Sequence, residues 1–240
     1  MTVTGYRRFT AAGVTAAVLL LAGCGSGDGQ GGTDAKSTPS ASAAPGGPDG
    51  TGSVRATRLD DTAVRALLPT DDSVPGWKAA APASAFDLTA ANAPTGPTCG
   101  KKTTDPICEN AVAAGSAMFL KEGAGTVTFM LYAYEDAASA SAAYPAMLGR
   151  GGDGMTGLSS PAKLPAAVGE QHDVIRGTSS VRTPGATVQI RVGTTLLAVQ
   201  TGGLQAERRG DGELRELAGM FAERSRQAQN GEPPSARVGG

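Results

Sequence analysis

The clearest regular structure is predicted for two neighbouring segments, residues 117–120, which are entirely apolar, and residues 126–134. In the second segment, Val127, Phe129 and Leu131 point to one side of a predicted strand, because successive side chains alternate along a strand. The side chains between them are also fairly apolar. A strand with two apolar faces is typical of the centre of a sheet, so we expect residues 126–134 to form a central strand.

A second group of strands is predicted later in the chain. Residues 168–176 indicate one strand, residues 187–192 alternate with the valines and the isoleucine inward, and residues 195–200 return. Gly193 stands at the first central position between the last two segments, which is typical of a type II′ hairpin turn. These segments therefore predict three strands, of which the last two form a hairpin.

Three helices are indicated by apolar positions at helical spacing. A short helix begins near Asp60 and ends before Pro69. A second covers residues 137–148, and Pro145 is expected to kink it or end it early. The third covers residues 213–229. The helices complete the order of elements that the chain predicts.

That order is helix, cysteine-containing loop, β-β-α and then β-β-β-α. Two strand groups that are each followed by a helix favour an α+β fold. We expect an antiparallel sheet of about five strands with the helices packed on one face, in a single extracytoplasmic domain of residues 57–229.

The first residues follow a different pattern, that of an export signal. Arg7 and Arg8 precede an uncharged stretch that ends in Leu21-Ala22-Gly23-Cys24. The stretch is short and rich in small residues for a transmembrane helix, which needs about 20 apolar residues. Besides a lipid-attachment signal, two interpretations of this N-terminal segment remain open: an ordinary secretory signal with an incidental cysteine, and an uncleaved membrane anchor. The arginine pair leaves the general and the twin-arginine export routes open.

The Leu21-Ala22-Gly23-Cys24 motif resembles the lipobox of bacterial lipoproteins. The resemblance implies that residues 1–23 are a signal peptide, removed before Cys24, and that the Cys24 thiol carries a diacylglyceryl group. Two acyl chains hold a protein stably on a membrane. The implied location is the outer face of the cell membrane, with the membrane itself as a partner.

Composition divides the rest of the chain. Residues 24–56 are almost entirely Gly, Ser, Thr, Ala, Pro and Asp, which predicts a disordered linker behind the lipidated cysteine. Residues 230–240 are rich in Gly and Pro and predict a disordered tail. The formal net charge is −1 and aromatic residues make up 4% of the chain. Without clustered cations or stacking platforms, nucleic-acid binding is excluded from the expected functions.

Cys99 and Cys108 remain once Cys24 is assigned to the lipid. An even pair of cysteines in an exported domain usually closes, so a Cys99–Cys108 disulfide is predicted. The alternative is a pair of zinc ligands, but eight intervening residues and the lack of a nearby histidine are poor zinc spacing. No metal or cofactor is predicted.

Candidate chemistry is sparse. His172 is the single histidine, and no G-x-S-x-G motif supplies a nucleophile for it, so no catalytic residue is predicted. A polar histidine at a strand edge is the simpler interpretation, and ligand contact the other. Trp77 follows a Pro-Gly turn and is either a core residue or a platform for a ligand. Carboxylate pairs, as in sugar hydrolases, stay open because their spacing in space is unknown.

Several segments are similar to uncharacterised cell-surface lipoproteins of actinobacteria, and the layout resembles the extracellular sensor domain of some mycobacterial receptor kinases. The resemblance covers most of residues 57–229. The segments that carry it are Leu67-Leu68-Pro69, Val74-Pro75-Gly76-Trp77, Cys108, residues 127–134 with the Ala-rich helix, Val168-Gly169-Glu170 and Arg191-Val192-Gly193. It implies a non-enzymatic, sensor-like module that binds an envelope ligand or a surface protein. The alternatives are an envelope hydrolase that uses His172 or paired carboxylates, and a carrier of apolar ligands, which needs an enclosed cavity of at least about 300 Å³.

Overall fold

The computed structural model divides into two units, Met1–Gly50 and Thr51–Gly240. All described residues belong to the second unit. They are residues 56–90, 99, 105–152, 154–179, 182–203 and 210–240. The predicted signal peptide, Cys24 and the linker up to residue 55 lie outside them, so the lipobox interpretation stays a prediction.

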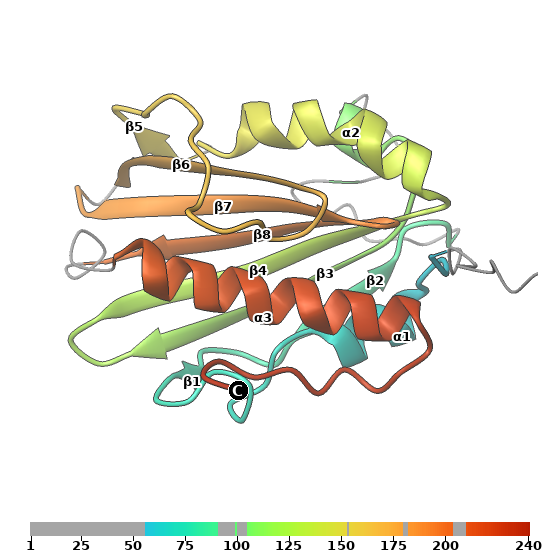
Figure 1. Cartoon of the computed structure of the whole chain (residues 1–240), viewed down its shortest axis with the longest axis horizontal. Coiled ribbons are helices and arrows are strands. Elements are labelled where there is room, and N and C mark those ends of the chain that lie inside the picture. Colours follow the sequence, from blue (N-terminus) through green and yellow to red (C-terminus); the bar gives the residue numbers. More distant parts are fainter. Residues whose placement is uncertain (1–55, 91–98, 100–104, 153, 180–181, 204–209) are drawn as a thin grey trace, which may run out of the picture. The chain divides into compact units, whose positions relative to one another are not determined.

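One antiparallel sheet organises the described residues (Figure 1). Its strand order is β1-β3-β4-β8-β7-β6-β5, and β2 also pairs with β3. The long strands are β3 (Ala111–Lys121), β4 (Gly125–Tyr134), β6 (Gln171–Ser179), β7 (Pro184–Val192) and β8 (Thr195–Gly202). The short ones are β1 (Lys78–Ala79), β2 (Ser84–Asp87) and β5 (Met155–Thr156).

The prediction of about five strands accounts for the long strands only, because the sheet has eight. The three additional strands contain two to four residues each, too few to show an alternating pattern. β4 does lie inside the sheet, between β3 and β8, as its two apolar faces predict.

Three α-helices and one short 3₁₀ helix accompany the sheet in the described part of the chain. They are α1 (Asp61–Leu67), α2 (Ala137–Arg150), α3 (Asp211–Gln229) and η1 (Pro106–Cys108). Asp60 caps α1 by accepting from the Ala63 amide at 2.8 Å.

Of the two alternatives for Pro145, a kink in α2 or an early end, the early end is wrong, because α2 continues to Arg150. Pro145 and Ser141, the residue whose carbonyl loses its helical partner, are both exposed. Water can therefore donate a hydrogen bond to the Ser141 carbonyl in place of the missing amide, so the helix tolerates the proline.

The helices cover both faces of the sheet, which corrects the prediction that they pack on one face. Val127, Phe129 and Leu131 of β4 share a core with α1 and α3. Tyr132 and Tyr134 of the same strand pack with α2 in a separate cluster. Because alternate residues of a strand point to opposite faces, we call these two sides the α3 face and the α2 face.

The core of the α3 face is built around aromatic rings. Phe129 contacts Phe221 of α3 at 5.2 Å between ring centroids and Phe119 of β3 at 5.9 Å, both edge to face. Trp77 is 4% exposed and belongs to the same core. The placement of Trp77 matches the interpretation as a core residue.

The C-terminal residues after α3 have defined contacts, which contradicts the predicted disordered tail. The Ala236 amide donates to Gln227 Oε1 at 3.2 Å, and the Val238 amide donates to the Ser73 carbonyl at 2.9 Å. Ala236 and Val238 also pack against the core of the α3 face. The Gly- and Pro-rich composition concealed two apolar side chains that hold the segment in place.

Candidate ligand-binding site

A cavity of about 220 Å³ lies on the α2 face, beside the C-terminal end of α2. It is open on one side, and its lining is part polar and part apolar. The lining residues come from η1, β4, the end of α2, β7 and β8: Ile107, Met130, Tyr132, Met147, Arg150, Gly151, Thr187, Gln189, Ala198 and Gln200.

The floor of the cavity consists of side chains in register across three strands. Met130, Ala198 and Gln189 are direct neighbours across β4, β8 and β7. Gln200 and Thr187 are paired in the next row. Since opposite residues of an antiparallel pair share a face, strand pairing alone brings these five side chains to one place.

Gln189 and Thr187 line this cavity, and each has a buried polar atom without a partner in the described part of the chain. They are 2% and 3% exposed. The Gln189 Nε2 group donates to the Met147 carbonyl at the end of α2, which fixes the amide because a carbonyl only accepts. Gln189 Oε1 and Thr187 Oγ1 have no hydrogen-bond partner among the described residues. Buried polar atoms are nearly always paired, so two orphans in one cavity form an exceptional cluster.

The glycine after α2 permits this arrangement. A Cβ atom at Gly151 would lie 2.7 Å from Gln189 Nε2 and 2.7 Å from Ile175 Cδ1. Neither separation is possible for a real side chain without displacement. Glycine therefore lets the end of α2 approach the Gln189 amide.

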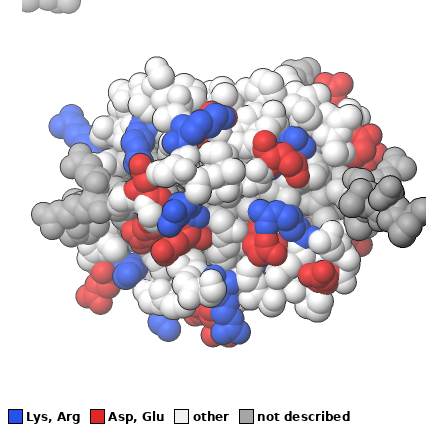
Figure 2. All heavy atoms as spheres, viewed as in Figure 1, with Lys and Arg blue, Asp and Glu red and all other residues white. Residues whose placement is uncertain are grey.

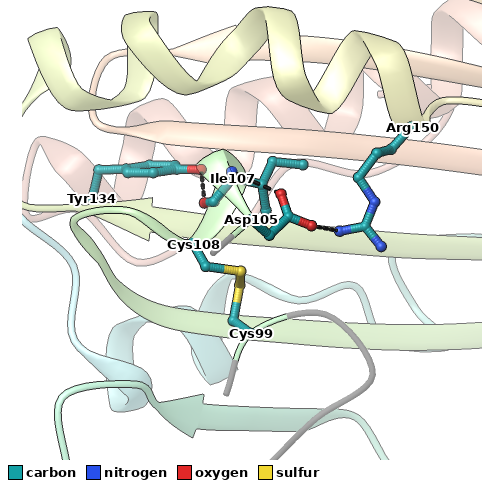
Figure 3. The surroundings of a disulfide bond; sticks show 6 residues. All are labelled: Cys99, Asp105, Ile107, Cys108, Tyr134 and Arg150. Atoms are coloured by element: carbon teal, nitrogen blue, oxygen red, sulfur yellow. Dashed lines mark hydrogen bonds and ion pairs between the residues drawn. A yellow bond between two sulfur atoms is a disulfide. The ribbon is translucent and has the colours of Figure 1, made fainter. Parts of the chain in front are cut away.

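One wall of the cavity is the η1 segment, which several bonds hold against the sheet (Figure 3). Tyr134 Oη donates to the Ile107 carbonyl at 2.6 Å, and Asp105 accepts from the Ile107 amide at 3.0 Å and pairs with Arg150. A disulfide joins Cys99 to Cys108, with a Cα–Cα distance of 5.3 Å. The predicted disulfide is thus confirmed, and Cys108 follows Ile107, the residue of η1 that lines the cavity.

The other wall, α2, is bound to the sheet by a buried polar contact. Tyr144 Oη donates to Asp173 Oδ2 at 2.7 Å, and Lys163 Nζ pairs with Asp173 Oδ1 at 2.9 Å. Burial, and then the hydrogen bond to Asp173, raise the pKa of the Tyr144 hydroxyl well above its usual range. The hydroxyl stays a neutral donor and holds the C-terminal half of α2 in place.

His172 and Trp77, the residues singled out for ligand contact, do not line this cavity. His172 lies on β6 beside Asp173 and points to the opposite face, because side chains alternate along the strand. Its Nδ1 accepts from the Val168 amide at 3.4 Å, and its buried Nε2 has no partner among the described residues. No nucleophile or carboxylate is hydrogen-bonded to the ring within the described part of the chain.

The pattern of residues 187–192 predicts a strand that contains Thr187 and Gln189, but it indicates no role for these two side chains. They alternate with the apolar positions and so resemble an exposed polar face. The signal that could have found them is the second apolar face of β4, which requires cover on that side of the sheet. Once that face of the sheet is covered, the polar side chains beside the apolar residues of β4 are buried as well.

Charged side chains form no patch of a single sign on the face of the molecule shown in Figure 2, because acidic and basic residues are interspersed there. The described residues contain no group of three or more His, Cys, Asp or Glu side chains that could hold a metal ion. Of the helices that the structure describes, none combines the length and the apolar character needed to cross a bilayer.

No protein-family model matches this chain, and no curated protein matches it. Among solved structures, it has a weak similarity to the extracellular domain of PknH from Mycobacterium tuberculosis, with 12% sequence identity and a TM-score of 0.46. The similarity covers 74% of this chain and 100% of the PknH chain. What this chain binds has to be inferred from its own residues.

Proposed function

We propose that this chain is a lipid-anchored, extracytoplasmic and non-enzymatic binding module whose α2-face cavity takes up a small ligand. The observation that carries the proposal is that two residues lining one cavity, Thr187 and Gln189, each have a buried side-chain oxygen without a hydrogen-bond partner among the described residues. Leaving such an atom without a partner costs about 1–3 kcal/mol. A ligand that supplies both hydrogen bonds recovers this free energy on binding.

The location is supported by the N-terminal pattern and by the disulfide. The Leu21-Ala22-Gly23-Cys24 motif follows a charged and an apolar segment, as in an export signal. The Cys99–Cys108 bond is typical of proteins that fold in oxidising compartments. Both features agree with a domain held outside the cytoplasm by an anchor on Cys24.

The alternatives receive less support from the described residues. A hydrolase centred on His172 needs a nucleophile or an orienting carboxylate at the ring, and the ring's hydrogen-bond partner is the Val168 backbone. An apolar carrier needs an enclosed apolar cavity, whereas this one is open and has Thr187, Gln189 and Gln200 in its lining.

The proposal is tested with the purified full-length protein, labelled at its methionine methyl groups and titrated with a library of molecules of up to about 15 non-hydrogen atoms. Met130 and Met147 line the cavity, whereas Met220 lies on α3. We expect hits that shift the methyl signals of Met130 and Met147 and leave that of Met220 in place.

A matched pair of variants identifies the cavity as the site. Ala198→Leu adds a bulky side chain to the cavity floor, and Ala142→Leu adds the same atoms on the exposed side of α2. We expect Ala198→Leu to abolish binding of the hits and Ala142→Leu to preserve it. A library that moves neither Met130 nor Met147 would overturn the proposal.

A further inference from the structure

We infer that the cavity on the α2 face recognises a neutral, hydroxyl-bearing ligand about the size of one monosaccharide ring, and that Gln189 and Thr187 each bind one of its hydroxyl groups. This inference rests on the proposed function and specifies the chemistry of its ligand. It follows from the hydrogen-bonding capacity, the charge and the size of the cavity.

The hydrogen-bonding capacity favours hydroxyl groups. Gln189 Nε2 is already used by the Met147 carbonyl, so the free Gln189 Oε1 can only accept, and the ligand must present a donor there. Thr187 Oγ1 can donate or accept. Thr187 and Gln189 are two residues apart on one strand, so their Cα atoms are separated by about 7 Å. Two hydroxyl groups on one small ring can meet both conditions, because each can donate and accept.

The charge of the lining favours a neutral ligand. Arg150 is the one charged side chain among the residues that line the cavity, and it pairs with Asp105. An anionic ligand would have to compete with Asp105 for Arg150, and a carboxylate or phosphate dianion offers no donor to Gln189 Oε1. A cationic ligand would lie beside Arg150, and the described lining residues include no carboxylate that could pair with it.

The size and the apolar part of the lining favour a compact ring. A volume of about 220 Å³ lies below the roughly 300–1,000 Å³ of pockets for drug-sized ligands, which limits the occupant to about a dozen non-hydrogen atoms. Met130, Met147 and Ile107 provide apolar contacts for C–H groups. A polyol ring combines C–H faces with hydroxyl edges, which is the same combination that the cavity offers.

The competing explanation is that ordered water occupies the site and satisfies both atoms permanently. The substitution Thr187→Val separates the two, because it replaces the hydroxyl by a methyl group of similar shape. If the hydroxyl is an orphan in the free protein, removing it raises the melting temperature of the free protein by about 2–4 °C. If water holds it, the same change lowers the melting temperature.

Thr195→Val is the matched control. Thr195 lies on β8 and is fully buried, but its hydroxyl donates to the Val192 carbonyl at 2.8 Å and contacts Ser225 Oγ at 2.7 Å. We expect Thr195→Val to lower the melting temperature by several degrees. Opposite signs for the two variants would identify Thr187 as the unpartnered group.

Binding is measured by titrating the methionine-labelled full-length protein with glucose and myo-inositol, and with glucuronate and glucosamine as charged counterparts of similar size. We expect the neutral probes to shift the Met130 and Met147 signals, and the charged probes to bind at least about tenfold more weakly. Thr187→Val, although more stable, should weaken the binding of glucose or inositol about tenfold, as expected for one lost hydrogen bond.

The outcomes distinguish the inference from the proposed function. If neither neutral probe shifts Met130 or Met147 while library molecules of another class do, the ligand chemistry inferred here is wrong and the binding function stands. If charged probes bind as well as neutral ones, or if Thr187→Val lowers the melting temperature, the inference is overturned. If no molecule of either set acts at the cavity, both fail.

Discussion

At the scale of single residues, Arg224 shows how a buried cation joins distant parts of the chain. Its side chain leaves α3 and donates to the last carbonyls of α1: Nε to Leu67 at 2.8 Å, and Nη2 to Ala66 at 3.1 Å and Leu68 at 3.2 Å. Nη1 donates to the Ala236 carbonyl at 3.3 Å. The last carbonyls of a helix have no partner within it, so Arg224 caps α1 from another helix.

Replacing Arg224 with methionine is expected to lower the free energy of unfolding by about 2–4 kcal/mol, because three carbonyls at the end of α1 lose their donor. Chemical denaturation measures the effect. Arg226→Met is the control on the same helix, since Arg226 is exposed and pairs with Glu223 one turn earlier. That change should stay within about 0.5 kcal/mol. Equal effects of the two variants would contradict the capping role.

The sequence could not reveal the roles of Arg224, Thr187 and Gln189. Arg224 reads as a residue at the border of an apolar stripe, and its acceptor at Leu67 is 157 residues away in the chain. Thr187 and Gln189 have the spacing of an exposed polar face. In each case the role depends on what lies opposite in space. Asp60, by contrast, has its partner three residues away and could be assigned from the local pattern.

At the scale of elements, length decided what the sequence could predict. β4 and β7 were recognised because their apolar positions alternate over many residues, whereas β1 with two residues leaves no pattern. The arrangement of the helices could have been inferred from β4. Both of its faces are apolar, and two apolar faces need cover on both sides, which α2 and α3 provide.

The disulfide at η1 leads to a testable prediction about this element. Removing the disulfide with Cys99→Ser and Cys108→Ser should lower the free energy of unfolding by about 2.7 kcal/mol, from the entropy of a loop of this size. It should also weaken binding at the cavity, because Ile107 next to Cys108 forms part of the wall. Thermal unfolding and the methionine titration check the two effects. A change in stability with unaltered binding would mean that Tyr134 and Asp105 hold the wall without the disulfide.

At the scale of the whole molecule, the proposed anchor determines where the cavity works. Expression of the full chain in a lipidating bacterium should place the protein in the membrane fraction. Mass spectrometry should detect an N-terminal peptide that begins at a diacylglyceryl-modified Cys24. The variant Cys24→Ala, with its lipid attachment site removed, should move to the soluble fraction. An unmodified Cys24 in a protein that stays on the membrane would instead favour an uncleaved N-terminal anchor.

The point at which the linker enters the domain has a mechanical consequence. The Thr57 amide donates to the Gln229 carbonyl at 3.4 Å, and the Thr57 carbonyl accepts from Thr194 Oγ1 at 3.2 Å in the turn between β7 and β8. If residues 24–56 form the proposed tether, a pull on it would load both the end of α3 and the turn between β7 and β8. The same two strands supply Thr187, Gln189, Ala198 and Gln200 to the cavity floor. With the proposed anchor and ligand, tension on the chain before Thr57 and occupancy of the cavity would therefore both act on β7 and β8.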